Sequence, residues 1–405
     1  MKRINFIIII LVFTITGVTA QAVSFSEIIT RINPDSLEKT MSDMEAFESR
    51  YAPRGNKDVA GYIINRLKQY GIDNAGIDSF YVEINPWFDE PFQGWMYNVK
   101  GILPGNENRE TTMIIGAHLD AISFNEEISW MLEEGTAGAD DNASGIAVML
   151  EIARLIHHFE LTPKMDLCFM AYDGEELGLL GAAYDAQKRY EQEEEILLMI
   201  NNDMVSYQPE QGVWYVDFLH YDNAWSFIET ALEICRTYTS MTPYFPDTEI
   251  SRFNERSDSW EYAKRGYKAL YFMEHEFTPY YHTPMDKTEF SNMAYITEIA
   301  KLNFGLIYNY AFDIITTDVA ESNTPAFTVN LFPNPASDHL LISIDDIHTD
   351  KYTFSIYDIY GRRYRQFFPE SNTTKTDISG LAPGIYLLTV SHADGSNYTA
   401  KFVKR

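Results

Sequence analysis

The sequence predicts an α/β fold, with a mostly parallel sheet sandwiched by helices, followed by a small all-β sandwich domain. Three observations lead to this prediction. Short apolar segments alternate with helical segments up to about residue 316, and this order requires crossovers that place helices on both faces of a sheet. Beyond residue 326 the pattern changes to short alternating strands separated by turn residues. The formal net charge of −28 also lies wholly before residue 327, because the 8 basic and 8 acidic residues after it cancel.

The 405 residues divide into four expected parts. Residues 1–20 form a predicted signal peptide, residues 24–316 the α/β domain, residues 317–326 a polar linker and residues 327–405 the β-sandwich. A hydrophobic fraction of 45% is enough for a sizeable core. The acidic excess argues against nucleic acid or an anionic membrane surface as a partner.

The first twenty residues have the three regions of a secretory signal peptide. Lys2 and Arg3 precede the apolar run FIIIILVFTITGV, and small residues follow at Val18-Thr19-Ala20. The alternative is a transmembrane anchor, but the apolar run is short for a bilayer span. Because no later segment is long and apolar enough to span, we expect an exported mature protein without a stable membrane span.

The elements of the α/β domain follow from the spacing of apolar residues. Val59, Ile63 and Leu67 recur at helical spacing, and Gly71 is a C-cap signal that ends this helix. The same criteria predict five strands, at residues 97–103, 111–117, 164–172, 196–200 and 267–274. They also predict helices at residues 142–159, 176–190, 224–236, 258–265 and 291–315.

The sequence contains two cysteines, Cys168 and Cys235, and leaves open whether they form a disulfide. They can pair in an oxidising compartment, as exported proteins allow. Cys168 lies inside an apolar strand, however, where a buried free thiol is equally consistent.

Candidate metal ligands occur where the predicted strands end. The set comprises His118, Asp120, Asp140, Asp141, Glu175, Glu176, Asp203 and His282. Because ligands collect at the carboxyl ends of parallel strands, we expect these side chains to converge in one cleft. Imidazoles and carboxylates without thiolates suit zinc or a similar divalent ion. Taken alone, the two adjacent glutamates also fit a solvated charged turn, and the repetition along the chain is what favours a site.

Five motifs, HLDA, GADDNASG, DGEELG, NNDM and YHTPMD, occur in this order between residues 51 and 312. Together they resemble the zinc aminopeptidases of family M28, which have a zinc-exopeptidase-like fold and use two co-catalytic metal ions. The resemblance implies five metal ligands, namely His118, Asp141, Glu176, Asp203 and His282. It also implies that Asp141 bridges the two metals, that Glu175 is the general base and that Asp120 orients the His118 ring. Tyr281 matches a tyrosine that stabilises the tetrahedral intermediate in some relatives.

The resemblance favours a secreted aminopeptidase that hydrolyses N-terminal residues from peptides and uses two divalent metal ions, with zinc as the expected metal. Two alternatives remain at this point. A glutaminyl cyclase shares the scaffold but uses a single zinc, and a non-catalytic binding domain on the same fold would lack ligands. The complete set of five ligands favours hydrolysis.

The C-terminal region carries a second resemblance. FPNPASDHL, YDIYGR, LAPGIYLLTV and a basic end at Lys404-Arg405 are similar to the sorting domain of the type IX secretion system. The implied partner is that secretion machinery, and the implied location is outside the cell or on its surface, after passage through the periplasm and outer membrane. The alternative is a carbohydrate-binding or stalk module of the same shape.

Three further features are weaker candidates. His275 begins like an H-E-x-x-H zinc helix, but residue 279 is Pro and no second His follows at that spacing. Asp258 matches an aspartate beside the substrate cleft of the family, although Ser259 stands where His is usual. Residues 124–136 separate two ligand motifs and are interpreted either as a flap over the cleft or as a surface loop.

Overall fold

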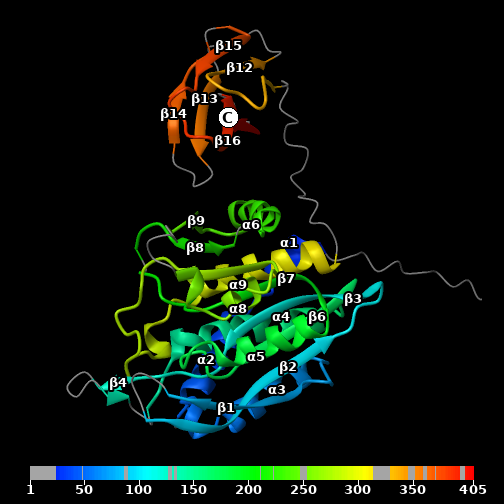
Figure 1. Cartoon of the computed structure of the whole chain (residues 1–405), viewed down its shortest axis with the longest axis vertical. Coiled ribbons are helices and arrows are strands. Elements are labelled where there is room, and N and C mark those ends of the chain that lie inside the picture. Colours follow the sequence, from blue (N-terminus) through cyan, green and yellow to red (C-terminus); the bar gives the residue numbers. More distant parts are fainter. Residues whose placement is uncertain are drawn as a thin grey trace, which may run out of the picture.

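A computed structural model describes residues 24–47, 49–85, 90–125, 130–131, 135–209, 211–221, 223–246, 253–312, 329–344, 352–358, 363–369, 371–392 and 397–405. They form a larger α/β unit and a smaller all-β unit, each with a hydrophobic core of its own (Figure 1). The predicted signal peptide and the predicted linker lie outside these ranges. Within the described ranges, no helix combines the length and the apolar character needed to cross a membrane.

The larger unit is built on a sheet of eight described strands in the order β1-β2-β6-β3-β7-β10-β8-β9. In chain order they are β1 (Gly76–Ile84), β2 (Phe92–Leu103), β3 (Asn108–His118), β6 (Met165–Tyr172), β7 (Glu195–Asn202), β8 (Tyr215–His220), β9 (Thr242–Tyr244) and β10 (Ala269–Glu274). The central strands β6, β3, β7 and β10 pair in parallel. The remaining strands join them by antiparallel pairs, except that β9 is parallel to β8. The centre of the sheet therefore confirms the predicted parallel arrangement.

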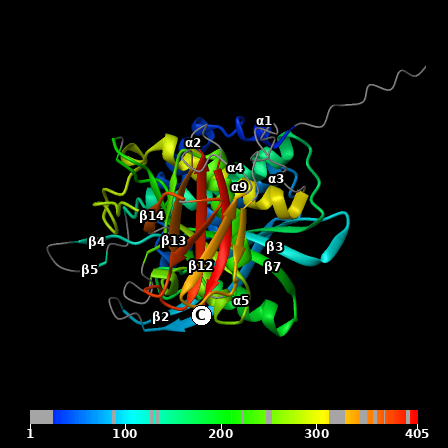
Figure 2. The same cartoon turned by 90° about the horizontal axis from the view of Figure 1, so that it is seen from above.

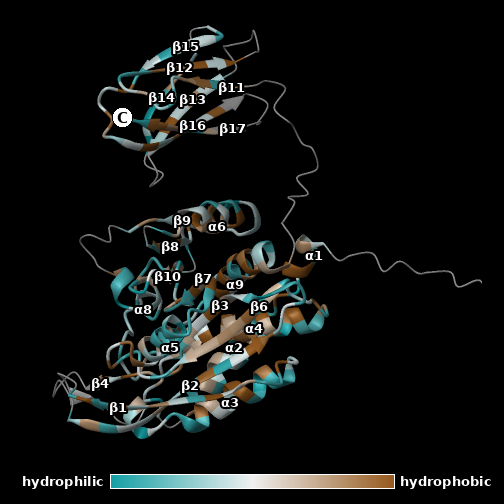
Figure 3. Ribbon diagram, turned by 45° about the vertical axis from the view of Figure 1, so that its right-hand side comes forward, coloured by the Kyte–Doolittle hydropathy of each residue, from teal (hydrophilic) through white to brown (hydrophobic). Residues whose placement is uncertain are grey.

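Helices cover both faces of this sheet, as predicted. One layer holds α1 (Phe25–Ile29), α2 (Pro34–Glu45), α3 (Lys57–Gln69), α4 (Ser144–His158), α6 (Trp225–Tyr238) and α9 (Met293–Ile307). The other layer holds α5 (Leu180–Glu191) and α8 (Ser259–Ala263). Short helical turns are η1 (Ala52–Arg54), η2 (Ala139–Ala143), η3 (Phe253–Glu255), η4 (Thr288–Phe290) and η5 (Tyr308–Phe312). The hydrophobic residues gather in the strands and helices at the centre of the unit (Figure 3).

The apolar strands are buried on both faces because successive side chains point in opposite directions. On β3, Met113 and Ile115 belong to the core beneath α4, whereas Ile114 belongs to the core beneath α5 and α8. The two cysteines divide in the same way, with Cys168 in the second core and Cys235 in the first. Both are buried free thiols, which answers the question that the sequence left open.

The helix predicted at residues 176–190 begins later, at Leu180. Gly174 and Gly178 have φ angles of +74° and +117°, which are outside the helical region, so residues 174–179 form a compact turn. This turn holds Glu175 and Glu176 at the end of β6 and keeps them out of the helix.

The smaller unit confirms the predicted all-β sandwich. One sheet has the order β11-β12-β15, from β11 (Val329–Phe332), β12 (His339–Ile344) and β15 (Thr373–Asp377). The other has the order β14-β13-β16-β17, from β13 (Tyr352–Asp358), β14 (Arg363–Phe367), β16 (Gly384–His392) and β17 (Asn397–Lys404). Leu340 and Ile342 of the first sheet share one core with Phe354 and Leu388 of the second. Figure 2 looks onto this unit, whose orange and red strands lie with their axes roughly aligned, although neighbouring strands are antiparallel.

Candidate metal centre

The predicted ligands lie at the carboxyl end of the parallel strands. His118 is the last residue of β3, Asp203 follows β7 directly, and Glu176 lies in the turn after β6. His282 belongs to the segment after β10, and Asp141 lies in η2, just before α4. Residues separated by more than a hundred positions therefore meet at one edge of the sheet, as the sequence predicts.

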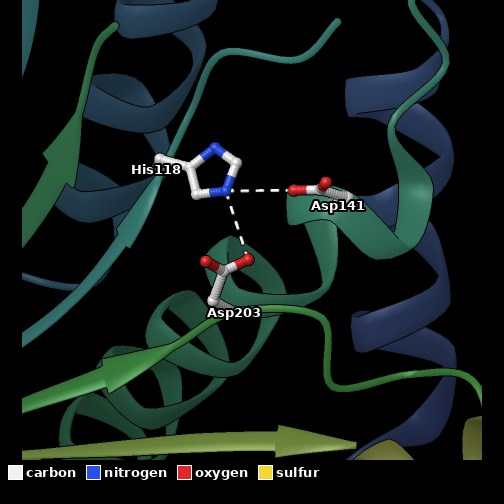
Figure 4. Close-up of side chains that lie close together, drawn as sticks. All are labelled: His118, Asp141 and Asp203. Carbon is white, nitrogen blue, oxygen red and sulfur yellow. Dashed lines mark hydrogen bonds and ion pairs between the residues drawn. The ribbon is translucent and has the colours of Figure 1, made fainter. Parts of the chain in front are cut away.

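The first group of side chains is His118, Asp141 and Asp203, all buried. Nε2 of His118 lies 3.1 Å from Oδ1 of Asp141 and 3.2 Å from Oδ1 of Asp203 (Figure 4). Ser257 donates its hydroxyl to the other oxygen of Asp203 at 2.6 Å and so fixes the direction of that carboxylate.

The second group is Asp141, Glu176 and His282. Nε2 of His282 lies 3.2 Å from Oδ2 of Asp141 and 3.0 Å from Oε2 of Glu176. Asp141 thus belongs to both groups, and its two oxygens face different imidazoles.

This donor set fits divalent metal ions. In each group the donor atoms lie within 4.8 Å of one another, and imidazole and carboxylate donors without thiolates suit zinc. Oε1 of Glu176 is buried and has no hydrogen-bond partner in the described part of the chain, and Nε2 of His282 meets its two carboxylates without a well-aligned hydrogen bond. A cation between these atoms would satisfy them.

Within the two groups, the pKa of each side chain depends strongly on the charges of its neighbours. Burial lowers the pKa of His282, but Glu176 and Asp141 outweigh burial and raise it to about 10. Burial and Asp141 raise the pKa of Glu176 to about 7, against the opposing effect of His282. Burial also disfavours ionisation of Asp141, yet the two imidazoles hold its pKa below the usual range. Such mutual dependence is typical of side chains arranged to share a cation.

Asp120 holds the ends of β3 and β6 together. Its Oδ1 accepts the backbone N–H of Glu175 at 3.1 Å, and its Oδ2 accepts that of Glu176 at 3.3 Å. Nδ1 of His118 lies 3.1 Å from the carbonyl oxygen of Asp120 and 3.5 Å from Oδ1. The carbonyl oxygen is therefore the closer partner of the ring, while the carboxylate mainly positions the two glutamates.

Glu175 and Tyr281 line the same cavity as the ligands. Glu175 is buried, and burial together with Glu176 and Asp203 raises the pKa of its carboxyl well above the usual value, against the effect of His118. The ring of Tyr281 stacks on His282, with 3.6 Å between the ring centroids. Both residues are therefore placed to act on a molecule bound next to the two groups.

The cavity has a volume of about 790 Å³ and two kinds of wall. Apolar side chains line one part, namely Met204, Phe253, Tyr271, Met273 and Phe277. Charged side chains, including Arg256 and Lys264, line another. Phe124 also lines the cavity, and most of the stretch 124–136, predicted as a flap or a surface loop, lies outside the described residues.

The other candidates lie outside the two groups. The sequence makes Asp140 a candidate ligand, but its Oδ1 accepts the backbone N–H and the hydroxyl of Ser206 instead. His275 contacts Asp217 at 2.7 Å and is not among the residues lining the cavity. Asp258 is fully buried, and neither oxygen of its carboxylate has a hydrogen-bond partner among the described residues.

Two residues near the site escaped prediction from the sequence. Asp286 belongs to the YHTPMD motif but carries no strand-end signal of its own. Arg50 is a single basic residue in an irregular segment, and no pattern in the sequence marks it as buried. Burial lowers the pKa of Arg50, and Asp286 is the carboxylate that opposes this effect most strongly.

Comparisons with known proteins place the chain in a family. The family described as "Peptidase family M28" matches residues 98–307, and the "Secretion system C-terminal sorting domain" matches residues 330–405. Leucine aminopeptidase 1 of Fusarium vanettenii is 25% identical over 325 residues, which are 73% of this chain and 78% of that protein.

Solved structures show the same fold. A zinc aminopeptidase from Bacillus subtilis superposes with a TM-score of 0.55 at 16% identity, covering 69% of this chain and 96% of that one. A glutaminyl cyclase from Bacteroides thetaiotaomicron superposes with a TM-score of 0.53 at 17% identity, covering 69% and 98%. With its M28 match across half of its length and its C-terminal match beyond, the chain belongs to peptidase family M28 and ends in a secretion-system sorting domain.

Proposed function

We propose that this protein is a secreted aminopeptidase that hydrolyses N-terminal residues from peptides at a centre of two zinc ions. The family and the relatives support a metallo-aminopeptidase hydrolase. The observation that carries the finer proposal is the shared carboxylate of Asp141, whose two oxygens face His118 and His282 separately. A pair of neighbouring divalent ions needs such a shared anionic ligand.

The proposed ligands are His118 and Asp203 for one ion, Glu176 and His282 for the other, and Asp141 for both. When bound, the ions supply Lewis acidity, which polarises the scissile carbonyl and favours loss of a proton from water. Glu175 accepts that proton and delivers it to the leaving amine. Tyr281 donates its hydroxyl to the oxyanion that develops at the scissile carbonyl. Asp120 keeps Glu175 in place through the backbone of the turn.

The cavity supports a preference for peptides with an apolar N-terminal side chain. Met204, Phe253, Tyr271 and Met273 pack as one cluster along its wall, so an apolar side chain placed there loses contact with water. With the ions bound, a free N-terminal amine in its neutral form would be a further donor that one of them could hold, which favours removal of the first residue over internal cleavage. A related fungal protein carries the name leucine aminopeptidase, which agrees with this preference.

A glutaminyl cyclase is the second candidate, because one such enzyme shares the fold. The complete set of five donors favours two ions and hydrolysis over a single zinc. Counting metal ions per chain distinguishes the two proposals.

The C-terminal sorting domain indicates type IX secretion, and we infer export through the periplasm and outer membrane to the cell surface or the medium. Residues 1–20 would direct the first step as a signal peptide, and residues 24–316 would be the catalytic domain. The separate cores of the two units support a boundary in the linker at residues 317–326.

An assay of the purified protein tests the function. The substrates are leucyl, phenylalanyl, lysyl and glutamyl amides, N-terminally blocked peptides and peptides with N-terminal glutamine, each with and without a chelator. We expect hydrolysis of the apolar amides, none of the blocked peptides, and loss of activity with the chelator. Cyclisation of glutamine peptides with one zinc per chain would replace this proposal with the cyclase.

A further inference from the structure

The loop that carries Asp141 is held from two sides. Asp286 contacts its N–H groups: one carboxylate oxygen accepts from Asp140 at 2.9 Å and the other from Asp141 at 3.0 Å. The carbonyl oxygen of Asp286 also accepts the backbone N–H of Ala139 at 2.9 Å. Asp286 thus fixes the backbone at the residue whose side chain belongs to both ligand groups.

Arg50 contacts the same loop through its carbonyl groups. Nη2 of Arg50 donates to the carbonyl oxygens of Ala137 at 3.2 Å and Gly138 at 2.5 Å. Gly138 has a φ of +53°, and a Cβ there would collide with Nη2 of Arg50, so the close approach depends on glycine. The guanidinium is completely buried, and its Nε and Nη1 have no hydrogen-bond partner among the described residues.

The main chain of Arg50 reaches the other ligand-bearing segments. Its carbonyl oxygen accepts the N–H of Ala121 at 3.0 Å, next to Asp120, and the side-chain amide of Asn56 at 2.9 Å. Asn56 in turn donates to Asp173 at 2.8 Å, directly before the turn that holds Glu175. One residue therefore connects the loops after β3 and β6 to the loop before α4.

We propose that Arg50 and Asp286 form a clamp that fixes the direction of Asp141, so that its two oxygens serve two metal ions. This inference rests on the proposed function and adds two positioning residues to it. Asp286 accepts hydrogen bonds from the backbone N–H groups of the loop, and Arg50 donates hydrogen bonds to its carbonyl oxygens. Residues behind metal ligands commonly control ligand direction in this way.

The chain offers a control in a buried Arg–Asp pair that lies elsewhere in the α/β unit. Nε of Arg189 contacts Oδ2 of Asp185 at 2.5 Å, and both side chains are fully buried. This pair lies in the core beneath α5 and α8 and touches none of the ligand side chains in the described residues. Its loss should therefore lower stability without altering metal coordination.

The experiment compares Arg50→Met, Arg50→Lys and Asp286→Asn with Arg189→Met and Asp185→Asn in the full chain. Each purified variant is stripped of metal and titrated with cobalt(II), and the visible absorption spectrum reports the coordination geometry independently of catalysis. Metal content, melting temperature, kcat and KM are measured alongside.

We expect Arg50→Met and Asp286→Asn to change the cobalt spectrum at saturation and to lower kcat by about 10–100-fold, with KM changed by less than about threefold. Arg50→Lys keeps the charge, but its nitrogen is one bond closer to the main chain than Nη2 and should not reach both carbonyl oxygens, so this variant should recover the melting temperature more than the wild-type cobalt spectrum. Arg189→Met and Asp185→Asn should lower the melting temperature and leave the cobalt spectrum, kcat and KM unchanged.

Wild-type cobalt spectra in Arg50→Met and Asp286→Asn would overturn the clamp, as would full recovery of spectrum and kcat in Arg50→Lys, which would assign the effect to charge alone. Failure of the proposed function is separate, since it would appear in the wild-type protein as a single bound ion or no peptidase activity.

Discussion

The backbone N–H of Glu175 donates to Oδ1 of Asp120 over 3.1 Å, which ties the turn after β6 to the end of β3. Asp120, two residues after the predicted ligand His118, thereby sets the position of the proposed general base. The same carboxylate accepts the N–H of Glu176, so two strand ends keep a fixed separation.

Asp120→Asn should weaken this connection, because an amide accepts through one oxygen only and loses the negative charge. We expect kcat to fall by about 10–100-fold with metal content unchanged. Steady-state kinetics and elemental analysis of the same preparation check both statements. A variant with normal kcat would show that the turn keeps its shape without Asp120.

Glu175→Gln removes the proposed proton acceptor and keeps the size of the side chain. We expect metal binding to persist and kcat to fall by about 10²–10⁴-fold, which is the usual contribution of a general base. Glu255→Gln is the control, because Glu255 lines the same cavity outside the ligand groups. Near-normal turnover in Glu175→Gln would remove Glu175 from the mechanism.

The shared position of Asp141 gives a prediction about metal counts. Asp203→Ala and His282→Ala each damage one donor group, so about one ion per chain should remain in each variant. Asp141→Ala damages both groups and should retain much less. Elemental analysis after gel filtration measures the difference, and equal losses in all three variants would contradict the two-group arrangement.

A pH effect on stability is expected at Asp217, outside the metal centre. Burial raises the pKa of this carboxyl from 3.8 to about 6, although the contact with His275 opposes the rise. The folded protein therefore holds the proton more tightly than the unfolded chain. The resulting stabilisation, about 3 kcal/mol, is fully present below about pH 4 and is lost as the pH rises through about 6.

Asp217→Asn isolates this effect. The melting temperature of the wild type minus that of the variant should decrease as the pH is raised from about 4 to about 7. A difference that stays constant over this interval would mean that Asp217 titrates like an exposed carboxyl.

The separate cores predict that the α/β unit functions without the sorting domain. Residues 24–316 expressed alone should hydrolyse amides with kcat and KM close to those of the full chain. Export should fail in cells that secrete the full chain. Loss of activity in a well-folded truncated protein would assign the C-terminal unit a part in the enzyme.

Much of the site follows from the sequence because its residues stand where apolar strands end. His118 and Asp203 come at the ends of runs that are buried on both faces, and such runs are recognisable without any structure. The β-sandwich was equally predictable, because short alternating strands are recognisable beyond residue 326 and β12 shows this alternation of buried and more exposed residues.

Other features depend on tertiary contacts that leave no local pattern. Strand β1 alternates between exposed residues and partly or fully buried ones, and its place at the sheet edge follows only from its pairing with β2. The helix predicted from Glu176 starts four residues late, because Gly174 and Gly178 adopt positive φ angles that composition alone does not reveal. Arg50 is buried because loops far apart in the sequence close around it.

Cys168 and Cys235 lie in cores on opposite sides of the central sheet, and each is a free thiol. The two sulfurs cannot meet unless the sheet between them comes apart. Folding of the α/β unit therefore needs no oxidant, and a reducing cytoplasm is as suitable for producing it as an oxidising one. Reductant added during purification should leave its melting temperature unchanged.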